Sequence, residues 1–391
     1  MAKEPGMSTA PPPGFEQTPA GLLVRAPAKV NLNLLVGPRR TDGFHDLDSL
    51  VVKISLHDEL LLSRGAGVPP APSDEDDLAS SNDQPYGTHN AGRMPAPRRD
   101  TVLLSCEGAD CGEVENNLVY RAARLLQSHV RETGLAKPGD NLSVRIHLTK
   151  RTPPGKGLGG GSSDAAATLT GLWRLWGLDR TDDRTAQPSA VLPAALATLA
   201  AQLGSDVPLF LTPNPCRMTG RGDILQPLDI TPLSMVLFLP DLFCATPAVY
   251  RTFDQLAASR GAGVSPALGG EIGLPSVNGL ACGTSDAGET PAPQPAHPLA
   301  ERQLDDACLR LPPSRWRHRL TNDLFPPACR VCPELATLHG RLQAHTDIPI
   351  LMTGSGSALF APCDNDLEAA RLLHALPPNL RQRGIIVQTV A

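Results

Sequence analysis

The sequence predicts an α+β protein with two domains. At 391 residues, the chain is long enough for two domains that each bury a core of their own. Short stretches in which apolar and polar residues alternate predict strands, and Ala/Leu-rich segments with apolar residues at helical spacing predict helices. The two kinds of segment do not follow the strict strand–helix–strand rhythm of a parallel sheet, so the α+β class is favoured.

The predicted strands and helices follow one another unevenly along the chain. Strands are expected within residues 22–62, for example at Leu22–Arg25 and Leu32–Val36. Later strands are expected at Leu142–Leu148, Met235–Leu239, Pro349–Met352, Ser357–Ala361 and Gly384–Val390. Helices are expected at Asn116–His129, Ala165–Leu178, Ala190–Leu203 with Pro193 in its first turn, Pro333–Ala344 and Leu367–Leu376.

Two long segments of the chain share one sequence pattern. Ser63–Ala71 recurs as Ser259–Ala267, and Gly87–Pro97 recurs as Gly283–Pro293 with the same spacing between the copies. Both segments are rich in Pro, Gly, Ser and Ala, so they cannot bury enough apolar surface to offset the entropy of an ordered chain. We therefore interpret them as disordered surface inserts of common origin.

Composition shifts mark the N-terminal tail and the two inserts. An N-terminal tail rich in Pro, Thr and Gly comes before the first predicted strand. The predicted organisation is a disordered tail at 1–21, an N-terminal domain at 22–217 with an insert at 63–99, and a C-terminal domain at 218–391 with an insert at 258–312.

Composition excludes several classes of function. A net charge of −5 provides no electrostatic basis for binding nucleic acid. The N-terminus lacks the apolar core of a secretory signal, and no run approaches about 18 apolar residues, so no membrane partner is expected. The nine cysteines show no regular framework and are expected to be reduced thiols, as in a cytoplasmic protein. The protein is expected to be a monomer or a homodimer. Cys329 and Cys332 form one close pair, which is weak evidence for zinc, and coincidence is favoured.

The most informative segment is a glycine-rich run, Pro153–Ala166, which leads directly into a predicted helix. Glycine lets the backbone approach a ligand closely and adopt positive φ. The first turn of a helix offers unpaired N–H groups and the positive end of the dipole, which together suit a phosphate. A Gly/Ser run can also be a flexible linker, but linkers rarely lead straight into a helix. The run therefore predicts a loop that holds nucleotide phosphates.

The type of phosphate loop can be narrowed from the spacing. A Walker A loop is excluded, because Lys156 is followed by Gly157 rather than by Ser or Thr. Gly155-x-Gly157-x-x-Gly160, with Asp179 about 20 residues further on, satisfies the dinucleotide fingerprint and leaves an NAD-dependent dehydrogenase as an alternative. That fingerprint requires a strand that ends at the loop, whereas Lys150–Pro154 separate the predicted strand from the glycines. The dehydrogenase is therefore the weaker interpretation.

The longer pattern Pro153–Asp164 resembles the ATP loop of the GHMP small-molecule kinases. Two further segments, Ala26–Leu34 and Leu351–Phe360, resemble the first and third motifs of the same superfamily and stand in the expected order. The resemblance implies an N-terminal domain like domain 2 of ribosomal protein S5 and a ferredoxin-like C-terminal domain. It also implies ATP as the phosphoryl donor, with Mg²⁺.

Finer motifs indicate one branch of this superfamily. Gly37–His45, Leu203–Phe210, Thr246–Tyr250 and Asn322–Leu324 resemble the GHMP kinases whose small-molecule substrate is a cytidine diphosphate-linked methylerythritol. The alternative within the superfamily is a kinase for another small alcohol such as homoserine, which would not need an aromatic site for a base. A catalytically inactive relative is disfavoured, because the two residues expected to be catalytic are present.

By this resemblance, Asp206 is the general base that takes the proton of the substrate hydroxyl, and Lys29 is its orienting charge partner. Burial of an acid beside the apolar run that follows Asp206 would be costly without such a task. Asn31, two residues after Lys29 on a predicted strand, shares its face and is expected to contact the substrate. The alternative roles are a turn aspartate and a surface lysine.

The resemblance also assigns residues to the two ligands. Phe44 and His45 would bind the cytosine, with Tyr250 as the second aromatic, although Phe44 stands where Tyr is usual. The alternative role for each aromatic is core packing. Gly354 and Gly356 would allow close approach to the substrate diphosphate. The expected ATP-binding residues are Pro154, Gly155, Lys156, Gly157, Leu158, Gly159, Gly160, Gly161, Ser162 and Ser163. Ser163 and Asp164 are candidates for Mg²⁺, although Asp164 could instead cap the helix.

Overall fold

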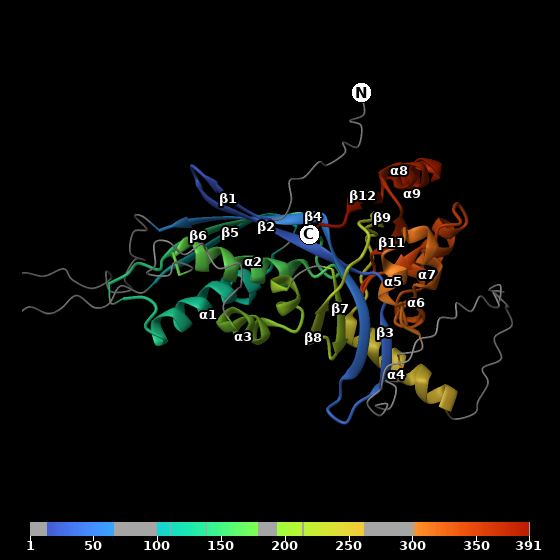
Figure 1. Ribbon diagram of the computed structural model, residues 1–391, viewed down its shortest axis with the longest axis horizontal. Helices are drawn as coiled ribbons and strands as arrows, with labels where there is room; N and C mark the ends of the chain where they lie inside the picture. Colours follow the sequence, from blue (N-terminus) through green and yellow to red (C-terminus); the bar gives the residue numbers. More distant parts are fainter. Residues whose placement is uncertain are drawn as a thin grey trace, which may run out of the picture. The chain divides into compact units, whose positions relative to one another are not determined.

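The chain folds into two compact units (Figure 1). The computed structural model describes residues 14–65, 100–109, 111–137, 139–178, 194–212, 215–261, 299 and 302–390. Unit 1 comprises residues 1–30, 51–216 and 386–391, and unit 2 comprises residues 31–50 and 217–385. These units are not the two contiguous segments 22–217 and 218–391, because 31–50 belongs with the C-terminal part and 386–390 with the N-terminal part.

Unit 1 is built on a sheet with the strand order β1-β2-β4-β6-β5. These strands are β1 (Phe15–Thr18), β2 (Gly21–Asn31), β4 (His45–Arg64), β6 (Val144–Lys150) and β5 (Val102–Gly108). β6 pairs antiparallel with β4 and parallel with β5. The sheet is therefore mixed, which is incompatible with the doubly wound parallel sheet of a dinucleotide-binding dehydrogenase.

Three helices pack on one face of this sheet (Figure 1). They are α1 (Leu118–Glu132), α2 (Gly160–Leu175) and α3 (Ala194–Leu203). Inward-facing sheet residues such as Leu60 and Ile146 share one apolar core with Leu126 of α1 and Leu169 of α2. Two short 3₁₀ helices pack against them: Val114–Asn116 precedes and contacts α1, and Pro208–Leu211 follows α3 and contacts both α2 and α3. The α2 helix therefore lies against the sheet with its N-terminus at the end of the glycine-rich run.

A second sheet has the order β10-β11-β9-β12, and its strands β10, β11 and β9 belong to unit 2. Its strands are β10 (Leu351–Met352), β11 (Leu359–Cys363), β9 (Ser234–Phe238) and β12 (Gly384–Gln388). Strand β3 (Leu35–Arg39) pairs with the start of β4, and β7 (Cys216–Gly220) pairs with β8 (Ile224–Pro227). The helices are α4 (Thr246–Gly261), α5 (Asp306–Leu309), α6 (Phe325–Val331), α7 (Pro333–Gln343), α8 (Asp366–Ala375) and α9 (Pro378–Arg381), with 3₁₀ helices at Pro313–Arg315 and Arg317–Arg319.

Some residues that the sequence predicts to be disordered belong to strands and helices in the structure. Phe15–Thr18 pairs with β2, so the tail prediction is wrong for those residues. The first expected insert begins too early, because Ser63 and Arg64 complete β4. The second is too long at both ends, because residues 258–261 extend α4, and buried Leu304 and Leu309 anchor the segment around α5. The rest of both inserts, Pro193 and Asp179 lie outside the described residues.

Candidate active site

Lys29 is held inside unit 1 against the glycine-rich loop. It lies near the end of β2, where the alternation stops and all residues from Ala28 to Asn31 are buried, and only 6% of it is exposed. Its backbone N–H donates to the carbonyl of Leu158 over 2.9 Å. A Cβ added to Gly159 would lie 3.1 Å from Lys29 Cγ. The first motif and the glycine loop, which are far apart in the sequence, are thus in contact.

Asp206 faces the same lysine. Burial lowers the pKa of Lys29, and the negative charge of Asp206 partly offsets this by raising it. Asp206 is half-buried, at the turn that precedes the 3₁₀ helix Pro208–Leu211. The buried residue Val207 and its hydrogen bond to Gly204 fix that turn. The structure therefore brings together the two residues that the sequence predicts to be catalytic.

The loop itself has a backbone that only glycine adopts readily. Gly155, Gly157 and Gly159 have φ of 71°, 80° and 68°. The α2 helix begins at Gly160, earlier than the predicted start at Ala165, because the glycines and serines form its first turn. The N–H groups of such a turn have no partner within the helix. They are therefore available to an anion.

A cavity of about 340 Å³ opens beside this loop. It is lined by the loop from Thr152 to Ser162 and by Asn116, Asn117 and Leu118 at the start of α1. Every predicted ATP-binding residue except Ser163 lines it, because Ser163 is turned into the protein and is 2% exposed. A Cβ at Gly160 would lie 2.8 Å from Thr152 Cγ2, so the narrow wall requires glycine there.

Beneath the loop lies a buried ion triad that sequence reasoning missed, formed by Asp58, Lys150 and Asp164. The ammonium of Lys150 donates to the carboxylate of Asp58 and, over 2.7 Å, to Oδ2 of Asp164. The other oxygen of Asp58 accepts the backbone N–H groups of Arg151 and Thr152, each at 2.6 Å. The triad thus binds both ends of the loop, its start at β6 and its end in α2.

Asp164 is neither a helix cap nor an exposed metal ligand in this arrangement. Its Oδ1 is buried without a hydrogen-bond partner among the described residues. Burial raises the pKa of Asp164 to about 8, although the charge of Lys150 opposes that shift. A proton on this carboxyl neutralises a charge that the buried position would otherwise destabilise.

This pKa gives a testable pH dependence. Between the unfolded pKa near 3.8 and the folded pKa of about 8, only the folded state holds the proton of Asp164, so stability falls as pH rises. In the wild type, the free energy of unfolding should fall by at most about 1.4 kcal/mol per pH unit. We expect Asp164→Asn to show no such fall, because its amide cannot ionise. Urea unfolding of both proteins at pH 5, 6, 7 and 8 measures it. If the free energies of unfolding of the two proteins changed with pH in the same way, the raised pKa of Asp164 would be contradicted.

Two of the predicted base-binding residues, His45 and Tyr250, lie together in unit 2. His45 is 7% exposed, and its ring lies 5.5 Å from that of Tyr250. Its Nδ1 donates to the carbonyl of Gly37 over 2.9 Å, and its Nε2 lies 3.1 Å from a carboxylate oxygen of Asp254. Both ring nitrogens therefore already have partners within the protein.

Phe44 is presented separately on the surface of unit 2. It is 56% exposed, and the guanidinium of Arg221 lies 5.2 Å above its ring. Arg221 lies in the turn between β7 and β8, flanked by two glycines with positive φ. Neither Arg221 nor Asp254 was found from the sequence, because each lies far along the chain from the residue that it contacts.

The third motif is fixed by an asparagine that the sequence marked only by resemblance. The side-chain amide of Asn322 donates to the carbonyls of Met352 and Gly354, over 2.7 and 2.9 Å. Asn31 donates its N–H to the hydroxyl of Thr353 over 2.9 Å, and its amide donates to Ser49. Asn31 and Gly354 are therefore held close together within unit 2, and Gly356 follows as a buried residue.

Comparison with known proteins identifies the family. Models of the GHMP kinases N terminal domain and of the GHMP kinases C terminal match residues 117–212 and 310–381. A 4-diphosphocytidyl-2-C-methyl-D-erythritol kinase from an Anaeromyxobacter species is 32% identical over 93% of this chain and 88% of its own length. The chain belongs to this family of GHMP kinases.

Two other relatives agree with the family. The 4-diphosphocytidyl-2-C-methyl-D-erythritol kinase of Symbiobacterium thermophilum is 39% identical over 59% of this chain, which spans 64% of that enzyme's length, less than two thirds. A solved 4-(cytidine 5'-diphospho)-2C-methyl-D-erythritol kinase matches with a TM-score of 0.56 and 30% identity, over 94% of this chain and 100% of its own. The predicted two-domain α+β GHMP kinase fold is thereby confirmed.

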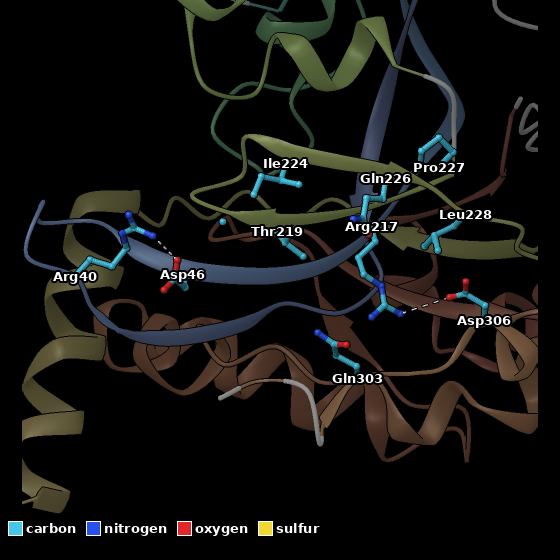
Figure 2. A pocket seen from close by; sticks show the side chains of 11 residues that line it. Arg40, Asp46, Arg217, Thr219, Ile224, Gln226, Pro227, Leu228, Gln303 and Asp306 are labelled. Carbon is cyan, nitrogen blue, oxygen red and sulfur yellow. Dashed lines mark hydrogen bonds and ion pairs between the residues drawn. The ribbon is translucent and has the colours of Figure 1, made fainter. Parts of the chain in front are cut away.

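A larger cavity lies elsewhere in unit 2, and Arg40 of the Gly37–His45 motif is one of its lining residues. It measures about 630 Å³ and lies between the β3–β4 and β7–β8 hairpins and the segment before α5 (Figure 2). Arg40 pairs with Asp46 at 2.6 Å, and Arg217 lies 3.8 Å from Asp306 (Figure 2). Each guanidinium therefore faces a carboxylate, which leaves no net charge to attract an anion.

The described ranges contain neither a candidate membrane span nor a candidate metal cluster. Within those ranges, no helix is long and apolar enough to cross a bilayer. Nor do three His, Cys, Asp or Glu side chains converge there as a metal site.

Proposed function

We propose that this chain transfers the γ-phosphoryl group of ATP to the 2-hydroxyl of 4-diphosphocytidyl-2-C-methyl-D-erythritol, a step in non-mevalonate isoprenoid biosynthesis. The observation that carries the proposal is the buried Lys29, which is hydrogen-bonded to the glycine loop and lies in the field of Asp206. This arrangement supplies a positive charge and a proton acceptor beside a phosphate-binding loop, which is what phosphoryl transfer requires. The names of the relatives supply the substrate.

The proposed mechanism assigns each step to residues of unit 1. Asp206 accepts the proton of the substrate hydroxyl as the oxygen attacks the γ-phosphorus. Lys29 stabilises the negative charge that develops between the carboxylate, the attacking oxygen and the phosphoryl group. The N–H groups of the loop from Gly157 to Ser162 hold the ATP phosphates, with Lys156 at the cavity wall.

Mg²⁺ is expected to be bound mainly by the ATP phosphates, where it would neutralise their charge. Ser163 and Asp164 are poor direct ligands, because Ser163 is buried and Asp164 is paired with Lys150.

Residues of unit 2 are proposed to bind the substrate. The exposed ring of Phe44 offers a face on which cytosine can stack. His45 and Tyr250 lie side by side and would form the second wall, with Asp254 holding the His45 ring in place. Asn31, Gly354 and Gly356 are proposed to contact the rest of the substrate.

One assay tests the proposed function. The purified chain is incubated with Mg-ATP and 4-diphosphocytidyl-2-C-methyl-D-erythritol, and in parallel with homoserine or mevalonate, and ADP release is measured. We expect turnover of the cytidyl substrate alone. Faster turnover of homoserine would favour the alternative, a GHMP kinase for another small alcohol.

The base-binding proposal makes a prediction of its own. We expect Phe44→Ala and Tyr250→Ala each to raise the KM for the cytidyl substrate and to spare the KM for ATP. The reason is the loss of stacking worth about 1–3 kcal/mol per aromatic, or about 5- to 150-fold in affinity. Steady-state kinetics measure both constants. Phe243→Ala, which removes another exposed ring, is the matched control. Unchanged substrate KM with lower thermal stability would indicate core packing instead.

A further inference from the structure

A lysine of β4, Lys53, anchors the segment that follows Asp206. The ammonium of Lys53 is partly buried and donates to the carbonyl of Phe210 over 3.3 Å and to the carbonyl of Thr212 over 3.0 Å. The two carbonyls lie at the end of the 3₁₀ helix Pro208–Leu211, where the last oxygens have no partner within the helix. Lys53 therefore fastens that end of the helix to the sheet of unit 1.

The same short helix is packed against the glycine loop. A Cβ added to Gly159 would lie 2.9 Å from Cζ of Phe210 and 3.1 Å from Cγ of Lys29. The ring of Phe210 therefore contacts the loop at the residue that the Lys29 side chain also contacts. Asp206 comes just before Val207, the residue that leads into the helix, and the N–H of Phe210 donates to the carbonyl of Val207 over 3.1 Å. A shift at one end of this helix would therefore move Asp206 and Phe210 together.

We propose that Lys53 is a positioning residue for phosphoryl transfer, which fixes the segment from Asp206 to Thr212 so that the proton acceptor stays beside Lys29. The inference rests on the proposed role of Asp206 as the general base. Lys53 is not among the described residues that line the nucleotide cavity. It therefore acts on the reaction through the anchored segment and not through a contact with the nucleotide.

The chemical step should depend on this anchor more than nucleotide binding does. A general base acts only within hydrogen-bond reach of the proton that it takes, and a displacement of about 1 Å can lower a rate about 10²-fold. The glycine loop has a fastening of its own, because Asp58 accepts the N–H groups of Arg151 and Thr152 at the start of the loop. Loss of the Lys53 ammonium should therefore misplace Asp206 while the loop still holds the ATP phosphates.

Steady-state kinetics of Lys53→Met test the proposal with Mg-ATP and 4-diphosphocytidyl-2-C-methyl-D-erythritol. The substitution removes the ammonium and keeps an unbranched side chain. We expect kcat to fall about 10- to 100-fold and the KM for ATP to stay near that of the wild type. Lys53→Arg, which keeps a cation with N–H donors, should retain more of the kcat. Equal losses of kcat in the two variants, or an unchanged kcat in Lys53→Met, would overturn the proposal.

Arg64→Met is the matched control, because Arg64 makes the same type of contact from the same strand. Its guanidinium donates to the carbonyl of Leu175 over 2.6 Å, at the end of α2 that lies away from the glycine loop. This variant also loses a cation of β4 that binds the end of a helix, but the helix end does not carry a residue proposed to be catalytic. Its kcat should equal that of the wild type, and an equal fall in both variants would overturn the proposal.

A double-mutant cycle separates positioning from a general structural effect. In the Asp206→Asn background, Lys53→Met should lower kcat little further, because no general base is left to position. An effect on the fold alone would instead lower kcat by the same factor in both backgrounds, and that result would overturn the positioning role.

Hydrogen–deuterium exchange of the peptide that contains Asp206–Thr212 measures the anchor without the reaction. Lys53→Met should exchange these amides faster than the wild type, and Arg64→Met should not, because only the first variant frees this helix. Unchanged exchange in Lys53→Met would overturn the anchor. Failure of the wild type to phosphorylate the cytidyl substrate would instead overturn the proposed function, while faster exchange would still support the contact that Lys53 makes.

Discussion

Asp206→Asn is expected to lower kcat by about 10²–10⁴-fold, the usual contribution of a positioned general base. The amide has the size of the carboxylate but cannot accept the proton of the substrate hydroxyl. Asp206 is half-buried in a turn fixed by Val207, so the fold and the KM for ATP should stay near those of the wild type. Initial rates with Mg-ATP and 4-diphosphocytidyl-2-C-methyl-D-erythritol measure the effect.

The matched control for this prediction is Asp229→Asn. Asp229 is exposed and forms a surface ion pair with Arg310 at 3.1 Å, a type of contact that contributes little. Its kcat should equal that of the wild type. A near-normal kcat for Asp206→Asn would remove Asp206 from the mechanism. If the variant lost thermal stability as well as kcat, the loss of activity would be explained by damage to the fold.

The glycine loop could be predicted from the sequence because its structure is local. The positions that need positive φ, Gly155, Gly157 and Gly159, must be glycine whatever surrounds them. The helix that follows shows itself through its own apolar spacing. Lys29 could be predicted only from its motif, because the alternating burial of β2 gives way to burial of every residue from Ala28 to Asn31.

The ion triad could not be predicted, because its members are set together only by the fold. Lys150 stood in the sequence as part of a spacer before the loop. Its partner Asp58 lies 92 residues earlier on a neighbouring strand, and Asp164 lies 14 residues later on α2. No local pattern relates these three residues, and the register of β4 against β6 decides their meeting.

The base-binding residues show a second limit of sequence reasoning. The resemblance assigned His45 to the cytosine, but it did not show that Gly37 and Asp254 are the partners of the two ring nitrogens. The sequence also does not reveal that one strand is divided between the two units. β4 is 20 residues long, and its first six belong to unit 2 and the remainder to unit 1, a division that composition does not reveal.

Asp58→Ala is expected to lower the free energy of unfolding by about 3–5 kcal/mol, the range seen when one partner of a buried ion pair is removed. Asp58 is fully buried, and it is the acceptor for Lys150 and for the N–H groups of Arg151 and Thr152. Its loss leaves an ammonium and two backbone donors without that acceptor at the start of the loop. Asp58→Asn, which keeps one carbonyl oxygen, should lose less.

Urea unfolding at pH 7 measures each variant, with Glu59→Ala as the control. Glu59 is the next residue, and its partly exposed pair with Arg151 should contribute only about 0–1 kcal/mol. If Asp58→Ala proved no more destabilising than Glu59→Ala, the triad would not be what holds the loop to the sheet, and the KM for ATP should then be the same in both variants.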